Sequence, residues 1–178
     1  MKQIQVSIKG ISPLLMHAYP MTPVEGLEKK TPEEQAEVSA YRTPKTRELH
    51  IPSTCIQRAL VAGAVYSKGK GRSTLTKVAA ACLLVSPEYC GLGQKTFQVD
   101  ARPVVIKATK GRIVRYRPRL DSWETTFTIE FDEILMKESE IRRIVDDTGS
   151  RVGLLDFRPA CKGPFGRFMV TAWKAQEE

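Results

Sequence analysis

The stretch Ser122-Trp123-Glu124-Thr125-Thr126-Phe127-Thr128-Ile129-Glu130-Phe131-Asp132 alternates between two kinds of side chain. Trp123, Phe127 and Ile129 share one side of an extended chain with Phe131, whereas both glutamates fall on the other side. Successive side chains of a β-strand point to opposite faces of the sheet. The stretch therefore predicts a half-buried strand, and with it a sheet that covers a core on one face.

Shorter strand patterns lie on both sides of this stretch. Residues 4–8 alternate apolar and polar side chains and predict a first strand, and residues 168–173 predict a last strand in the same way. Residues 97–106 and 113–116 flank the turn signal Lys110-Gly111, which predicts a β-hairpin.

Two helices are predicted from spacing and end signals. Ile51-Pro52-Ser53 opens the clearer one, with Ser53 as its N-cap and apolar residues at helical spacing through Tyr66. Residues 137–148 form an amphipathic pattern that Gly149 is expected to stop. Residues 74–85 fit either a helix or a buried strand, and the pattern leaves both open.

The order of these elements predicts the fold class. A strand, a helix, an antiparallel pair, a helix and a strand follow the β-α-β-β-α-β plan of an α+β, ferredoxin-like (RRM-like) fold. The chain of 178 residues fits one domain with an extra β-hairpin. An insertion at about residues 18–50 follows the first strand, rich in proline and charge, with a short helix expected at 31–41.

Composition excludes several classes of protein. None of the four cysteines forms a C-x-x-C pair and the chain has only two histidines, so we expect free thiols, no metal site and no cofactor. The apolar runs are too short to span a bilayer, and the first residues lack the apolar core of a signal peptide. We expect a cytoplasmic protein that does not bind membranes.

Positive charge is concentrated in the middle of the chain. Residues 68–119 contain 12 Lys or Arg and two acids, or +10, whereas the whole chain carries +8. Such clustering predicts a local anion-binding face, for which a nucleic-acid phosphate is the simplest ligand. A solvated surface that keeps the protein soluble is the alternative.

A glycine-rich stretch, Gly163-Pro164-Phe165-Gly166-Arg167-Phe168, precedes the last predicted strand. Its two glycines, Gly163 and Gly166, let the backbone approach a ligand and expose N–H groups, and Lys162 and Arg167 add charge beside them. We interpret the stretch as a clamp on a phosphate backbone. Phe165 is either a platform for a base or a core aromatic residue.

Three features together resemble the RAMP superfamily of CRISPR-associated RNA-binding proteins. They are a first strand that ends in Gly10-Ile11-Ser12-Pro13-Leu14, the helix start Ile51-Pro52-Ser53 with Arg58 one turn on, and the stretch from Gly153 to Phe168. The chain is most similar to the backbone subunits of Cascade-type effector complexes, and its length fits a compact relative. The resemblance implies antiviral defence in a ribonucleoprotein, with single-stranded guide RNA, copies of the chain itself or other effector subunits as partners.

With RNA as the ligand, the residue types assign a set of contacts to the sugar-phosphate backbone. This set is Ser53, Gln57, Arg58, Lys68, Lys70, Arg72, Arg115, Arg117, Arg119, Lys162, Gly163, Phe165, Gly166 and Arg167.

No catalytic residue is assigned, and we expect a binding protein. One alternative is a metal-independent endoribonuclease of the same superfamily that uses His17 or His50, with Asp156 in the glycine-rich region. Another is an interaction protein that mimics or blocks a CRISPR effector.

Overall fold

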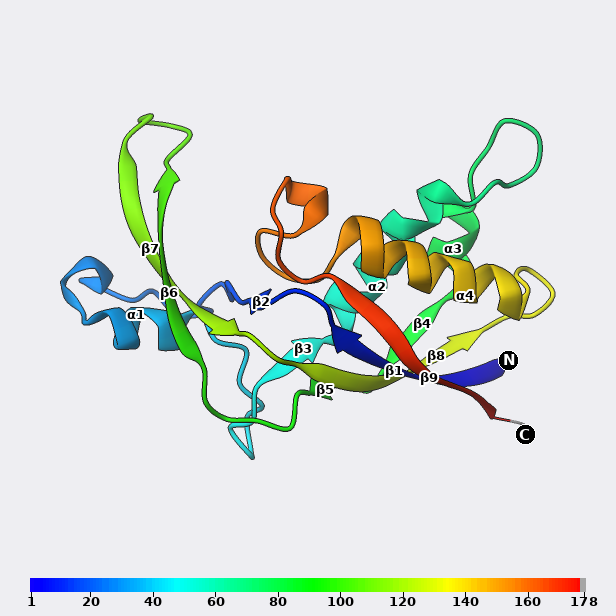
Figure 1. Cartoon of the computed structure of the whole chain (residues 1–178), viewed down its shortest axis with the longest axis horizontal. Coiled ribbons are helices and arrows are strands. Elements are labelled where there is room, and N and C mark those ends of the chain that lie inside the picture. The colour runs from blue at the N-terminus through cyan, green and yellow to red at the C-terminus, as the bar shows by residue number, and fades with distance from the viewer. Residues whose placement is uncertain (177–178) are drawn as a thin grey trace.

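The computed structural model describes residues 1–176 and has an α+β fold with antiparallel sheets (Figure 1). The central sheet has four strands in the order β4-β8-β1-β9. These are β4 (Leu84–Ser86), β8 (Glu124–Phe131), β1 (Lys2–Gly10) and β9 (Phe168–Gln176). Each neighbouring pair is antiparallel, so the first and last strands lie side by side.

The alternating residues of β1 and β8 build the core face of this sheet. Ile4 lies opposite Ile129 and Val6 opposite Phe127, and all four side chains are buried. Because the side-chain period of a strand is two, this register places every large apolar residue of both strands on the same face. The predicted first, central and last strands are confirmed.

Three helices cover that face (Figure 1). They are α2 (Ser53–Gly63), α3 (Thr76–Cys82) and α4 (Glu138–Asp147). Their apolar stripes enter the core through Ile56, Leu60, Ala79, Ile141, Ile144 and Val145. Each large side chain buried there contributes about 1.5–3 kcal/mol. The short 3-10 turn at Ala64–Tyr66 extends α2 to the predicted end.

Two predicted helix signals are wrong. Pro52 occupies the N-cap of α2, and Ser53 is the first helical residue without a side-chain capping bond. At the other helix, α4 ends at Asp147, and the chain continues as a π-helical turn, Thr148–Val152, through Gly149. Gly149 lies there because a Cβ would come 2.3 Å from the carbonyl oxygen of Phe168.

The predicted hairpin forms a second, three-stranded sheet in the order β2-β7-β6. Its strands are β2 (Leu14–Leu15), β6 (Gln98–Val105) and β7 (Arg112–Leu120). The hairpin of β6 and β7 projects away from α2, α3 and α4 at one end of the molecule (Figure 1). It lies outside the central sheet, in which β8 pairs with β4 on one side and with β1 on the other.

The excursion at residues 18–50 lies beside this hairpin (Figure 1). It contains a 3-10 turn at Leu27–Lys29 and the predicted short helix, α1 (Pro32–Val38), which starts with a capping box between Thr31 and Glu34. The excursion ends in β3 (His50–Pro52), which pairs with β5 (Tyr89–Gly91).

Residues 74–85 contain both structures that their pattern allowed. α3 occupies the alanine-rich part, and β4 follows after Leu83. All four cysteines are free thiols, as expected.

Candidate functional site

The glycine-rich segment, defined here as residues 153–167, is held against the loop that follows β1. The amide of Gly166 donates to the carbonyl of Pro13 at 2.8 Å, and the amide of Arg167 donates to the Ser12 hydroxyl at 3.0 Å. Within the segment, the Leu154 amide donates to the Gly166 carbonyl at 3.0 Å. These bonds fix the segment to the body of the protein before it enters β9.

The glycines of this segment let the backbone approach itself. Gly166 has φ +75°, and a Cβ there would lie 2.0 Å from the carbonyl oxygen of Leu154. A Cβ at Gly163 would lie 1.9 Å from the carbonyl oxygen of Phe157. The segment therefore needs glycine at both positions to close its own fold.

The amide groups expected to face a ligand are already used. The N–H groups of Gly163, Phe165 and Gly166 donate to the carbonyls of Arg158, Phe157 and Pro13 at 3.0, 3.1 and 2.8 Å. All three donor residues are also buried. The prediction that these glycines expose N–H groups to a phosphate is therefore wrong for these amides.

Phe165 is a packing residue. Its side chain is 3% exposed, and its ring centroid lies 5.9 Å from that of Phe157. The guanidinium carbons of Arg102 and Arg119 lie 4.8 and 5.6 Å from the Phe165 centroid. The ring therefore joins the hairpin to the glycine-rich segment through cation–π contacts and has no free face for a base.

Three arginines of β7 were predicted to contact RNA, and the structure gives them different partners. Arg117 is buried and forms an ion pair with Asp156, and Arg119 lies 2.7 Å from Asp121 and 3.5 Å from Asp100. Arg115 has no ion pair within residues 1–176. Arg115 is thus the one of the three whose charge is not already paired.

A basic pocket lies where α2 meets the glycine-rich segment. It has a volume of about 410 Å³ and is lined by Cys55, Arg58, Ala59, Ala62, Val152, Gly153, Leu155, Arg158 and Ala160. Two arginines and no acid line it, so it favours an anion. Arg158 is positioned by its own Nη1, which donates to the Leu155 carbonyl at 2.7 Å. We call this the Arg58–Arg158 pocket.

The backbone beside this pocket is unusual. Leu155, Phe157 and Lys162 have φ values of 60°, 46° and 63°, in the left-handed region that non-glycine residues rarely adopt. Strained residues of this kind gather at functional sites, where surrounding bonds hold them. Lys162 is exposed within the segment, directly after the 3-10 turn at Pro159–Cys161, and Arg167 is exposed near the junction with β9.

Two polar residues of α2 point inward instead. Ser53 is buried, and Gln57 donates from Nε2 to the carbonyl of Leu83. Ser53 is therefore withdrawn from a ligand by its burial, and the amide nitrogen of half-buried Gln57 is already used inside the protein. Arg58, on the same helix, is exposed.

Beside the pocket, the carboxylate of Asp156 contacts both Arg117 and His17. Arg117 donates to Oδ2, and Nδ1 of His17 lies 3.6 Å from the same oxygen. Burial alone would raise the pKa of Asp156, but the contacts with His17 and Arg117 outweigh it and lower this pKa to about 2. Asp156 is therefore ionised at neutral pH, and His17 stays partly exposed.

Tyr41 interacts with both this carboxylate and Cys55 of the pocket lining. Burial raises the pKa of its phenol to about 12, with Cys55 and Asp156 adding to the shift. Tyr41 therefore stays protonated at neutral pH.

His50 has a different environment. It is 4% exposed, its ring contacts Tyr89 edge-on at 4.8 Å, and Nδ1 lies 3.4 Å from the Thr43 hydroxyl. Burial lowers the pKa of His50, and Glu88 and Glu48 offset part of this effect. His50 is therefore a neutral core histidine.

The remaining predicted cations lie elsewhere. Lys68, Lys70 and Arg72 are exposed on the loop between α2 and α3, at the end of the molecule opposite the hairpin (Figure 1). The structure therefore does not bring this loop together with the arginines of β7, and the +10 segment forms two separate basic regions.

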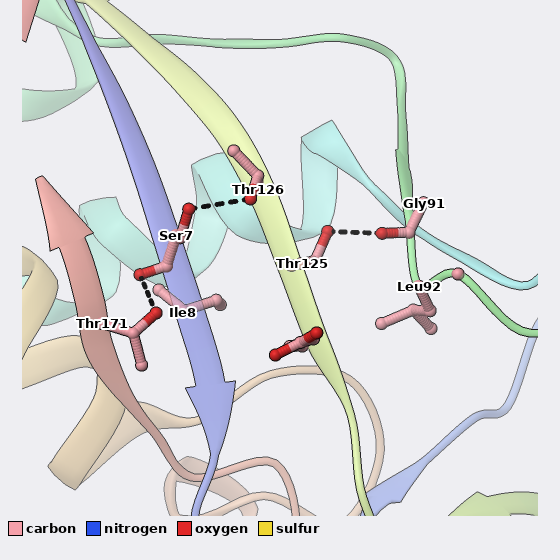
Figure 2. A pocket seen from close by; sticks show the side chains of 9 residues that line it. Ser7, Ile8, Gly91, Leu92, Thr125, Thr126 and Thr171 are labelled. Carbon is pink, nitrogen blue, oxygen red and sulfur yellow. Dashed lines mark hydrogen bonds between the residues drawn. The ribbon is translucent and has the colours of Figure 1, made fainter. Parts of the chain in front are cut away.

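A further pocket, of about 410 Å³, lies on the uncovered face of the central sheet (Figure 2). The Ser7 and Thr126 hydroxyls bond each other at 2.8 Å, and the hydroxyls of Thr125 and Thr171 donate to the carbonyls of Gly91 and Ser7 (Figure 2). Glu124 is the one charged residue of its lining. This pocket offers no positive charge to a phosphate.

Comparison with known proteins gives no match to a protein-family model and none to a curated protein. Residues 1–176 contain no group of three His, Cys, Asp or Glu side chains placed to hold a metal ion. None of the helices in that range has the length and apolar character needed to cross a bilayer.

Proposed function

We propose that this protein binds single-stranded RNA through the sugar-phosphate backbone, without reading sequence. The observation that carries the proposal is the Arg58–Arg158 pocket, where two arginines without ion pairs among the described residues meet in an acid-free lining. A guanidinium group matches the geometry of a phosphate and keeps its charge at every physiological pH.

The interface extends from this pocket along two exposed cations, Lys162 and Arg167, and the half-buried Arg115. Lys162 and Arg167 belong to the adjoining segment, and Arg115 stands on the hairpin that the segment supports. Lys68, Lys70 and Arg72 form a second contact region at the far end, which suits a ligand longer than the pocket.

The proposal includes a fold relationship and a biological setting. The order β4-β8-β1-β9, with helices on one face, supports a ferredoxin-like core in which the hairpin and the excursion are additions. Together with the resemblance to RAMP proteins, it supports a compact cytoplasmic relative of the guide-RNA-binding backbone subunits of CRISPR effectors.

Binding of a fluorescein-labelled single-stranded RNA, followed by anisotropy at several salt concentrations, tests the proposal. We expect affinity to fall steeply with salt, and Arg58→Ala with Arg158→Ala to weaken it about tenfold or more and reduce the salt slope by about two. Arg143→Ala, which removes an exposed arginine of α4 outside the pocket, is the matched control.

Two outcomes would contradict the proposal. One is equal binding by the double variant and the control. The other is a purified chain that carries no RNA and binds none, but copurifies with a protein partner after nuclease treatment. The second outcome would favour an interaction protein.

A second candidate function, RNA cleavage without metal, is favoured by the pairing of His17 with Asp156 at 3.6 Å. An ionised carboxylate orients an imidazole so that its exposed nitrogen can accept a proton from a ribose 2′-hydroxyl. Incubation of labelled RNA with EDTA tests this candidate. Cleavage that disappears in His17→Ala would support it, and intact RNA would exclude it.

A further inference from the structure

A groove lies at the end of the molecule opposite the hairpin, between the 67–74 loop, α3 and the connection from β8 to α4 (Figure 1). Its volume is about 620 Å³. It is lined by Lys68, Gly69, Lys70, Ser73, Thr74, Leu75, Val78, Ile134, Leu135 and Glu140. We call it the Ile134 groove.

The groove combines an apolar surface with positive charge. Ile134 is 89% exposed and Leu135 is 54% exposed, although both are large apolar side chains. Lys68 and Lys70 form no ion pair within the described part of the chain, and the one acid of the lining, Glu140, caps the start of α4. An occupant that is apolar and acidic would satisfy both parts of this surface.

A segment of the same chain has this composition. Residues 19–28 include Tyr19 and Met21, which are 87% and 94% exposed, followed by Glu25 and Glu28. Neither glutamate has an ion pair among residues 1–176, and the 3-10 turn in this region buries no side chain. The segment thus presents two unpacked apolar side chains and two unpaired acids.

We propose that the Ile134 groove receives residues 19–28 of a second copy of this chain. In this arrangement, Met21 and Tyr19 cover Ile134 and Leu135, while Glu25 and Glu28 approach Lys68 and Lys70. The segment and the groove lie at opposite ends of the molecule, so one chain cannot fill its own groove (Figure 1).

The symmetry of the contact follows from this separation. Two different surfaces meet, so each bound copy still offers one free segment and one free groove. A contact of this kind is head-to-tail and propagates into an open chain of copies unless its rotation closes a ring. The inference uses no residue of the Arg58–Arg158 pocket and does not depend on RNA binding.

Sedimentation velocity of the nuclease-treated full chain over a wide concentration range tests the proposal. We expect the weight-average sedimentation coefficient to rise with concentration, and Met21→Glu or Ile134→Glu to weaken association about tenfold or more, since each removes one large apolar contact. Lys70→Glu and Glu28→Lys should each weaken association, and the double variant should recover part of it. Met169→Glu, at an exposed apolar residue of β9, is the matched control.

A mixing experiment identifies the geometry. Ile134→Glu keeps its segment and Met21→Glu keeps its groove, so each alone should be monomeric and their mixture should form dimers and nothing larger. A wild-type chain that stays monomeric throughout, or variants that associate as the wild type does, would overturn the inference. RNA binding by Met21→Glu, whose substitution lies outside both proposed RNA contact regions, should remain at the wild-type level, which separates this inference from the proposed function.

Discussion

Arg117 of β7 donates through Nη1 to Oδ2 of Asp156 in the glycine-rich segment. This ion pair joins two regions that are 39 residues apart in the sequence, and His17 approaches the same carboxylate. The base of the hairpin is thus attached to the segment that lines the Arg58–Arg158 pocket. Any substitution in the pair is expected to act on both regions.

Asp156→Asn should remove a contribution to the free energy of unfolding that depends on pH. The pKa of Asp156 is lowered from 3.8 to about 2, so its stabilisation is complete above about pH 4 and is lost as pH falls towards 2. Urea unfolding should show the wild type more stable than the variant at pH 6, with the difference shrinking below pH 4. Asp146→Asn, at an exposed residue of α4, is the control. A difference that persists unchanged at pH 2 would argue against this role.

Gly166→Ala should destabilise the protein far more than Gly93→Ala. Both glycines have positive φ, +75° and +68°, but a Cβ at Gly93 meets nothing within 4 Å, whereas one at Gly166 meets the Leu154 backbone. We expect the free energy of unfolding to fall by about 1–2 kcal/mol in Gly93→Ala from backbone conformation alone, and by about 3 kcal/mol or more in Gly166→Ala. Thermal unfolding measures both. Equal losses would mean that the segment can open without cost to the fold.

Arg115→Ala should affect RNA binding, whereas Arg117→Ala should affect stability. Arg115 is unpaired among the described residues, so its loss should weaken RNA binding and leave stability within about 0.5 kcal/mol of the wild type. Removing buried Arg117 leaves the Asp156 carboxylate without its arginine partner and should lower the free energy of unfolding by about 3 kcal/mol. Urea unfolding and anisotropy on the same preparations separate the two effects. A stability loss in Arg115→Ala would place that side chain in the hairpin's structure instead.

His50 should make the protein less stable in mild acid. Its pKa is lowered by burial, so its contribution is present above about pH 6.5 and is lost as pH falls from there towards the lowered pKa of the folded state. Denaturation at pH 7.5 and 5.5 should show a decline that His50→Phe reduces, because phenylalanine keeps the contact with Tyr89 without titrating. His17→Ala, which leaves His50 intact, should retain the decline. The same decline in His50→Phe would assign it to other groups.

The sequence predicted the elements that depend on local patterns. Alternation identified β1, β8 and β9, and the turn at Lys110-Gly111 identified the hairpin, because strand periodicity and turn chemistry act within a few residues. The N-cap at Ser53 was wrong by one residue, since Pro52 already supplies the non-helical backbone that starts α2.

The candidate site depends on contacts between residues that are far apart in the sequence, and the sequence pattern identified only part of it. Arg58 was predicted, but its partner Arg158 was not, although Phe157-Arg158-Pro159 stands in the stretch that suggested an RNA-binding family. The glycine spacing was read as space for a ligand, whereas the chain itself fills that space. No local signal shows that Arg117 will be buried, because its partner Asp156 comes from a separate region of the chain.

The position of β1 between β8 and β9 has a consequence for synthesis on the ribosome. β1 emerges before β8 and β9, its two neighbours in the sheet, and these follow only after most of the residues described here have been translated. The apolar face of β1, formed by Ile4, Val6 and Ile8, therefore stays without its native neighbours while the later residues are translated. Pairing at such long sequence separation is slow and exposes unpaired strand edges. Nascent chains of this protein are therefore expected to depend on chaperones until β9 has left the exit tunnel.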